Sequence, residues 1–228
     1  MFYLTMISGK TVHGLHLPNS SAILARSLTP NARFIVILRD PVTRIYSQYK
    51  MHYAVSPQHF DTSVRAAIKD FNACIQKDGG YSEQCVYGNL KSSAPKTGTK
   101  ANPVYNAIDH LRSGLYHIFL REWLAVFPKD RFLIIKAESY YKDMYGYITN
   151  TVFPFLGLSS VTEKRTQKCI ESQEPVHVTS AKLRSNPNAI NVSYSEPMLE
   201  TTRQLLYDFY KPYNEELVKL LDDPKWSW

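Results

Sequence analysis

The sequence has few cysteines, no long apolar run and no concentrated block of positive charge, and each absence excludes a class of protein. Only 3 of the 228 residues are cysteine, which is too few for a small scaffold held together by disulfides. No stretch approaches the roughly 18–20 consecutive apolar residues that a membrane-spanning helix needs. No run of five or more lysines and arginines occurs, so the chain lacks the basic arm typical of nucleic-acid-binding proteins.

Metal-ligand spacing and internal repeats are also missing. His13 and His16 lie three residues apart without a third ligand, and none of the 7 histidines has ligand spacing with a cysteine or a carboxylate. We therefore expect no bound metal. Without repeats or low-complexity segments, neither a solenoid nor a globally disordered chain is expected.

The composition that is present is typical of one globular domain. Hydrophobic residues make up 44% of the chain and charged residues 21%, so a sizeable core can form. The formal net charge is +7, which favours anionic partners such as a phosphorylated cofactor, anionic lipid or a sulfated polysaccharide. We expect a single domain over residues 1–228 and no nucleic-acid partner.

The most informative stretch is ARFIVILRDPVTRIYSQYK, residues 32–50. Residues 34–38 form an unbroken apolar run, which predicts a strand buried on both faces, as in a parallel sheet. Polarity changes within one residue at Arg39, and Pro41 ends the strand and suits the first turn of a helix. The pattern thus predicts Arg39 at the carboxyl edge of a sheet, where open α/β folds bind phosphorylated ligands.

Hydrophobic spacing and helix-stop signals predict the other elements. Helices are expected over residues 20–28, 61–77, 105–127, 143–156 and 198–210, with Pro212 breaking the last and 215–221 continuing it. Strands are expected over 132–135 and 3–7, and an irregular loop over 81–103. Because strands alternate with helices, we predict a three-layer α/β fold with a parallel central sheet.

The segment over residues 34–47 resembles the 3′-phosphate-binding segment of sulfotransferases that use 3′-phosphoadenosine 5′-phosphosulfate (PAPS). The family pattern is a strand, Leu-Arg-x-Pro, a further arginine and a serine. By this resemblance, Arg39 and Ser47 hold the 3′-phosphate of PAPS. A guanidinium can bond phosphate oxygens bidentately, and a hydroxyl near a helix N-terminus adds a donor. The alternative interpretation is an arginine that ends a strand and a serine on a solvated helix face.

Further pieces resemble, in the same order, the carbohydrate sulfotransferases of the Golgi. They lie at residues 30–33, 74 with 85, 113–116, 123–127, 132–134, 153–157 and 208–214. The resemblance covers residues 30–228 and implies a Rossmann-like, P-loop-NTPase-like sulfotransferase fold, with PAPS as co-substrate. It also implies a glycosaminoglycan acceptor such as chondroitin or dermatan sulfate, and a location in the Golgi lumen with a membrane anchor absent from these residues.

The N-terminal region departs from this family. The family begins with a Lys-Ser-Gly-Thr-Thr-type loop that cradles the 5′-phosphosulfate, followed by a Gly-Glu pair whose carboxylate acts as the base. The best counterpart here is Gly9-Lys10, and Leu4 stands where a P-loop needs glycine. We therefore expect residues 1–30 to be divergent or incomplete, the domain to be N-terminally truncated, and the base to be unassigned. The alternative is a degenerate relative that binds nucleotide or sulfated polysaccharide without turnover.

Three further expectations concern arginine and lysine side chains. Lys182 and Arg184 fall where the family closes a basic loop over the nucleotide; ordinary surface charge is the alternative interpretation. Arg44 lies in the motif and is expected to hold the turn through Asp40 rather than contact a ligand.

Two modifications suit an oxidising, secretory compartment. Cys74 and Cys85 lie eleven residues apart across a glycine-containing bend, which suits a local disulfide and leaves Cys169 over as a buried thiol. Asn19 and Asn191 each begin an N-glycosylation acceptor pattern, a short motif that also arises often by chance.

Overall fold

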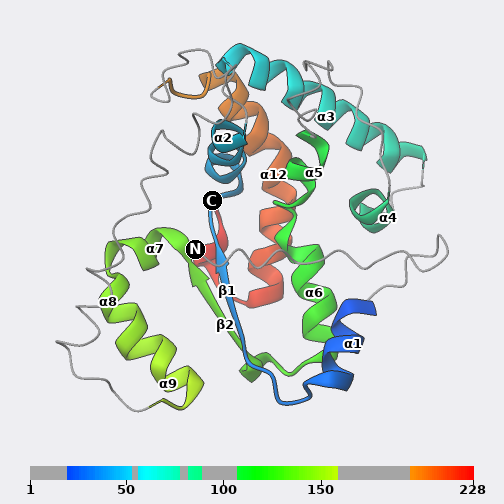
Figure 1. Cartoon of the computed structure of the whole chain (residues 1–228). Helices are drawn as coiled ribbons and strands as arrows, with labels where there is room; N and C mark the ends of the chain where they lie inside the picture. Colours follow the sequence, from blue (N-terminus) through cyan, green and yellow to red (C-terminus); the bar gives the residue numbers. More distant parts are fainter. Residues whose placement is uncertain (1–19, 53–55, 78–81, 89–106, 159–195) are drawn as a thin grey trace.

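The computed structural model describes residues 20–52, 56–77, 82–88, 107–158 and 196–228 (Figure 1). The helices and strands are, in chain order, α1 (Ser20–Leu28), β1 (Phe34–Leu38), α2 (Pro41–His52), α3 (Pro57–Lys77), α4 (Ser82–Tyr87), α5 (Ala107–Arg112), α6 (Tyr116–Val126), β2 (Phe132–Lys136), α7 (Ala137–Lys142), α8 (Met144–Tyr147), α9 (Phe153–Leu156) and α12 (Glu200–Leu221). Short 3₁₀ turns span Lys129–Arg131 and Pro224–Trp226, and a π-helical segment spans Ile148–Val152. The expected strand over residues 3–7 lies outside the described residues.

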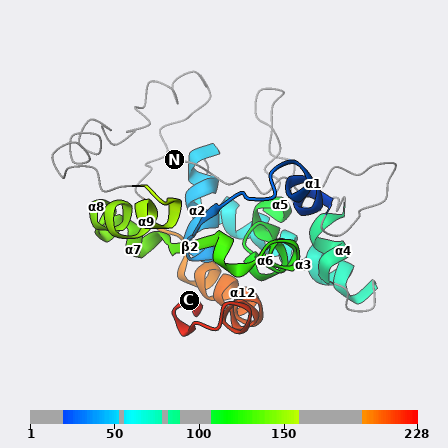
Figure 2. The same ribbon diagram turned by 90° about the horizontal axis from the view of Figure 1, so that it is seen from below.

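The two described strands form a parallel pair, which confirms the predicted α/β class with a parallel sheet. Their register runs from Phe34 opposite Phe132 to Leu38 opposite Lys136. Figure 1 shows the strands side by side, with α6 and α12 on one side and α7, α8 and α9 on the other, and Figure 2 agrees. Burial on both faces was expected for β1, and this is wrong at Ile37, which is 44% exposed.

The buried side chains form two clusters, and α12 contributes to both. The first lies among α2, α3, α5 and α12, and its large members include Tyr49, Phe60, Phe71, Leu111 and Tyr210. The second lies between the sheet, α6 and the end of α12, and includes Val36, Leu38, Leu120, Leu217 and Trp226. Helix α12 therefore links the face of the sheet to the helical part of the core.

The long helix predicted over residues 105–127 is interrupted, and this prediction is wrong at its centre. The chain turns at residues 113–115 between α5 and α6. The ring of Tyr210 lies against Gly114, where an added Cβ would come within 2.7 Å of the Tyr210 Cε1. The Tyr210 hydroxyl donates a hydrogen bond of 2.8 Å to the Leu111 carbonyl. The ring of Tyr210 on α12 thus leaves no room for a Cβ at this turn.

Two boundaries in the region of α3 and α4 also differ from the prediction. Helix α3 begins at Pro57 rather than Asp61, because proline suits the first position of a helix and needs no N–H partner there. Asp61 therefore lies within the helix and accepts hydrogen bonds from Arg65 and from Thr202. Part of the expected loop forms α4.

The two C-terminal helical regions follow the prediction with corrections. Over residues 143–156, Asp143 caps the start of α8 and accepts the Gly146 N–H at 2.8 Å. The helical region continues through the π-helical segment into α9, which Gly157 caps. Helix α12 begins at Glu200 and continues through Pro212, which was expected to break it. Proline removes one intrahelical hydrogen bond. Buried side chains before and after it, including Tyr210 and Leu217, hold the helix together.

Candidate functional site

The turn between β1 and α2 is the predicted strand–turn–helix unit. Asp40 precedes the helix, is only 7% exposed, and its Oδ1 accepts the N–H of Val42 at 3.0 Å. Its carbonyl oxygen accepts the N–H of Arg44 at 2.9 Å. Asp40 is therefore the N-cap of α2. The Val42 N–H, which could otherwise bind an anion at this helix end, is used within the chain.

Side chains from three other elements hold this turn. The Tyr116 hydroxyl on α6 donates to the carbonyl oxygen of Arg39 at 2.9 Å. Glu138 on α7 accepts the N–H of Asp40 at 3.0 Å, and the Tyr207 hydroxyl on α12 donates to Asp40 Oδ2 at 3.4 Å. Burial raises the pKa of Tyr116 and, together with the charge of Asp40, that of Tyr207. Both phenols therefore stay protonated and able to donate at neutral pH.

A cleft of ≈ 590 Å³ opens beside the turn at the carboxyl edge of the two strands. It is lined by Arg39, Asp40, Thr43, Lys136, Ala137, Glu138, Tyr141 and Trp228. The guanidinium of Arg39 makes no hydrogen bond or ion pair with any residue that the structure describes. The ammonium of Lys136 is already held, since it donates to the Lys225 carbonyl at 2.7 Å and lies 4.9 Å from the ring centre of Trp228. Arg39 is thus the cation in this cleft that is available to an anion.

The other predicted residues of the motif helix lie further from the cleft. Ser47 is exposed on α2, one turn beyond Thr43 and on the same helix face, and it does not line the cleft. Arg44 donates to the Gln48 side chain at 2.9 Å and to the His110 carbonyl at 2.6 Å, which links α2 to α5.

The remaining sequence-based candidates are outside the part of the chain that the structure describes. These are Gly9-Lys10, Asn19, Cys169, Lys182, Arg184 and Asn191. Their proposed roles stay predictions.

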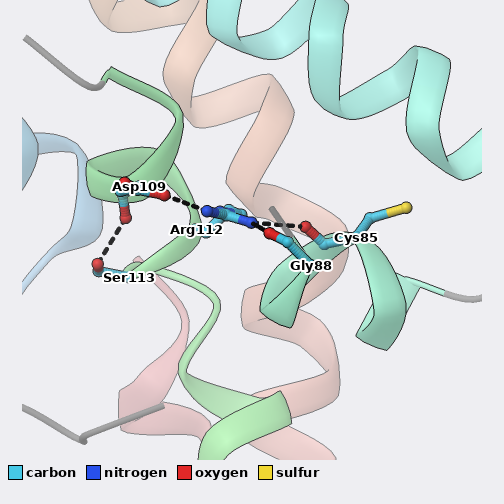
Figure 3. Close-up of polar contacts among 5 residues, drawn as sticks. All are labelled: Cys85, Gly88, Asp109, Arg112 and Ser113. Carbon is cyan, nitrogen blue, oxygen red and sulfur yellow. Dashed lines mark hydrogen bonds and ion pairs between the residues drawn. The ribbon is translucent and has the colours of Figure 1, made fainter. Parts of the chain in front are cut away.

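The structure contains a disulfide between Cys74 and Cys85, with the two Cα atoms 5.8 Å apart. It joins the end of α3 to α4. Arg112 on α5 holds the other end of α4, because its Nη1 donates to the carbonyl oxygens of Cys85 at 3.1 Å and Gly88 at 2.6 Å (Figure 3). The same guanidinium forms an ion pair with Asp109. The disulfide and the two hydrogen bonds from Arg112 therefore fix this short helix.

Two features are absent from the part of the chain that the structure describes. Among the described residues, no group of three or more histidine, cysteine, aspartate or glutamate side chains is arranged to hold a metal ion. None of the described helices is long and apolar enough to cross a membrane.

Sequence reasoning did not assign Glu138, Tyr116, Tyr207 or Trp228 to the site. A signal existed for Glu138, because carboxyl ends of adjacent parallel strands meet at one edge of a sheet. Residues 136–138 follow the second predicted strand, so they belonged beside the turn at Arg39. For the two tyrosines and Trp228 no local signal exists, because their elements reach the turn only through the tertiary fold.

The described residues thus form an α/β unit of parallel strands, turn and helix, in which Arg39 borders a cleft without a partner among those residues. The comparison with protein families makes this more specific, because residues 8–205 match the family described as Sulfotransferase domain. The chain belongs to the sulfotransferase family.

Known relatives with similar sequences are carbohydrate and heparan sulfate sulfotransferases. Human carbohydrate sulfotransferase 15 is 36% identical over 203 residues, which cover 87% of this chain and 31% of that protein. Carbohydrate sulfotransferase 15 of Nototodarus sloanii is 30% identical over 180 residues, which cover 79% of this chain and 98% of that protein. Mouse heparan sulfate glucosamine 3-O-sulfotransferase 6 is 24% identical over 223 residues, which cover 96% of this chain and 52% of that protein. The chain thus spans under a third of the length of the human relative.

Among solved structures, a sulfotransferase from Alicyclobacillus acidocaldarius superposes with a TM-score of 0.48 at 15% identity, covering 91% of this chain and 62% of the other.

Proposed function

We propose that this domain transfers a sulfuryl group from PAPS to a hydroxyl of a glycosaminoglycan such as chondroitin or dermatan sulfate. The observation that carries the proposal is the guanidinium of Arg39, which borders the cleft without a partner among the described residues. Arginine is always charged and its fork matches phosphate oxygens. Family membership supports sulfate as the transferred group.

The co-substrate would be held mainly through its 3′-phosphate. Arg39 would bond this phosphate, and Thr43 and Ser47 would offer hydroxyl groups along the same face of α2. Lys182 and Arg184 would close over the nucleotide. PAPS supplies the sulfuryl group, and the residues named here bind and orient the nucleotide.

An anionic sugar polymer is the proposed acceptor. The net charge of +7 favours such a partner, and relatives are named for carbohydrate and heparan sulfate glucosamine. The motifs between residues 30 and 228 resemble those of N-acetylgalactosamine 4-sulfate 6-O-sulfotransferase, which points to chondroitin or dermatan sulfate. A membrane contact is proposed only through an anchor outside these residues.

The first prediction concerns the 3′-phosphate. Arg39→Ala should lose a charge-assisted bidentate contact of about 1.5–3 kcal/mol with adenosine 3′,5′-bisphosphate. Calorimetric titration of adenosine 3′,5′-bisphosphate and of 5′-AMP measures the contribution of that phosphate in each variant. Arg131→Ala is the control. Arg131 directly precedes the first residue of β2, at the end of the strand away from the cleft, and its removal deletes one positive charge but should leave the affinity for both nucleotides unchanged. Equal affinity of the wild type for the two nucleotides would show that the proposed site is wrong.

The second candidate function is nucleotide or polysaccharide binding without turnover, and Lys10 in place of the family's glutamate favours it. Loss of a general base typically lowers a rate by about 10² to 10⁴. Under this second candidate, the 228 residues bind the nucleotide product but transfer sulfate poorly. The assay is transfer of labelled sulfate from PAPS to chondroitin. Robust turnover would exclude this candidate and would show that another group acts as the base.

The proposed location is the Golgi lumen, where a disulfide can persist. The pair of Cys74 and Cys85 in the structure supports this location. Mass spectrometry of unreduced protein from the secretory pathway should detect the linked peptides and glycans at Asn19 and Asn191. Free thiols at both cysteines would contradict the proposed compartment.

A further inference from the structure

The turn after β1 and the first turn of α7 are joined by a hydrogen bond beyond the last paired residues of the two strands. The last pair is Leu38 and Lys136, and two residues further along each chain stand Asp40 and Glu138. Glu138 Oε1 accepts the N–H of Asp40 at 3.0 Å. Glu138 Oε2 is buried and accepts no hydrogen bond from the described residues. The hydrogen bond that this carboxylate accepts through Oε1 therefore comes from the turn that carries Arg39.

The same peptide unit is held at both of its polar ends. Its C=O belongs to Arg39 and accepts from the Tyr116 hydroxyl, while its N–H belongs to Asp40 and donates to Glu138. The two groups of a trans peptide point in opposite directions in one plane. Bonds to both fix that plane, which determines ψ of Arg39 and φ of Asp40. The direction in which the Arg39 side chain leaves the backbone is fixed as a result.

A glutamate at this position weakens the binding of an anion in the cleft, so its presence there calls for a second role. Glu138 lines the same cleft as Arg39, so its negative charge repels a bound phosphate. Glu138 also lies in the first turn of α7, where an acidic side chain can interact favourably with the N-terminus of its own helix. The observed carboxylate instead reaches across to the neighbouring turn.

We propose that Glu138 is a positioning residue, which fixes the Arg39–Asp40 peptide so that the guanidinium of Arg39 is presented to a phosphate in the cleft. It acts through Arg39 and does not touch the ligand. The identity of that ligand as a 3′-phosphorylated nucleotide rests on the proposed function.

The two roles of the carboxylate predict opposite changes in phosphate affinity when Glu138 is replaced. If Glu138 acted only through its charge, neutral variants would all bind the phosphate more tightly. If it positions the turn, Glu138→Ala should bind adenosine 3′,5′-bisphosphate about tenfold more weakly, with the affinity for 5′-AMP unchanged. Glu138→Gln keeps an oxygen that accepts the Asp40 N–H, so it should bind at least as well as the wild type.

The experiment is calorimetric titration of both nucleotides into the wild type, Glu138→Ala and Glu138→Gln, with thermal unfolding to check each fold. Asp130→Ala is the matched control, because Asp130 is an exposed carboxylate before the opposite end of β2. If Glu138→Ala does not fold, Glu138→Asp replaces it, since the shorter side chain keeps the charge but loses the reach. Wild-type affinity in Glu138→Asp would then overturn the inference.

A double variant separates this inference from the proposed function. In the Arg39→Ala background, Glu138→Ala should have no further effect on 3′-phosphate binding, because the group it positions is gone. If the wild type does not distinguish the two nucleotides, the proposed function is wrong and the inference falls with it. If Arg39→Ala loses the 3′-phosphate contribution while Glu138→Ala keeps it, only the inference is overturned.

Discussion

At the scale of single residues, Tyr116 shows how the site depends on a side chain that faces no ligand. Its hydroxyl bonds the Arg39 carbonyl, and its ring packs against Trp228, with the ring centres 6.0 Å apart. Because burial raises its pKa, the phenol stays neutral through the physiological range. The bond to the turn is therefore insensitive to pH.

Tyr116→Phe should lower the free energy of unfolding by about 1 kcal/mol, because it removes one buried hydrogen bond and keeps the ring. Urea unfolding monitored by tryptophan fluorescence measures the change. Tyr141→Phe is the control, since Tyr141 lines the same cleft but is 55% exposed, and it should be neutral. An equal effect of the two variants would mean that the bond to Arg39 contributes nothing to stability.

At the scale of elements, the sequence predicted the helix and strand boundaries that neighbouring residues determine. The boundary between β1 and α2 was correct because an apolar run, an arginine and a proline follow one another within eight residues. The break at Gly114 was not predicted, and the ring that packs against this glycine belongs to Tyr210, a residue on a helix far along the chain. Pro212 was expected to break α12, but buried side chains on both sides outweigh one lost hydrogen bond.

For the site, sequence predicted Arg39 at the edge of a sheet but not the groups that hold it. The motif contains Arg39 and Asp40, so their position followed from local pattern. Tyr116, Glu138 and Tyr207 come from three other elements. Their contribution depends on how strands and helices pack, which a local pattern does not encode.

Gly114→Ala should destabilise the fold by about 1–3 kcal/mol, because the new methyl group would overlap the buried ring of Tyr210. Chemical denaturation gives the value. The cost of the same change in a Tyr210→Leu background should be smaller, because the ring that it overlaps is absent. An unchanged cost in that background would show that backbone conformation, and not the ring, requires glycine.

At the scale of the whole molecule, two partly or fully buried histidines make stability depend on pH. Burial lowers the pKa of His59, beside the Tyr49 hydroxyl, and of His117, stacked on Tyr213, although Glu216 partly opposes the shift at His117. The unfolded chain therefore binds protons more readily than the folded chain once the pH falls below 6.5. Stability is unaffected by these groups above that pH and decreases below it.

We expect a smaller free energy of unfolding at about pH 5.5 than at about pH 7.5. In His117→Phe, which keeps an aromatic ring against Tyr213, the free energy of unfolding should decrease less between these two pH values. Urea unfolding at several pH values measures both. The carboxylate of Asp61 does not interfere, because hydrogen bonds from Arg65 and Thr202 outweigh its burial and keep its pKa below 3.8. A pH-independent stability, or one that rises on acidification, would contradict the assignment.

Helix α12 carries side chains of both buried clusters and also the Tyr207 hydroxyl that reaches Asp40. Neither cluster can open fully without displacing this helix, so the domain should exchange its core amide hydrogens through one cooperative unit rather than two. A nucleotide bound at the turn raises the free energy of that shared opening by mass action. Occupancy of a cleft at one edge of the sheet would thereby slow exchange in helices that never approach it.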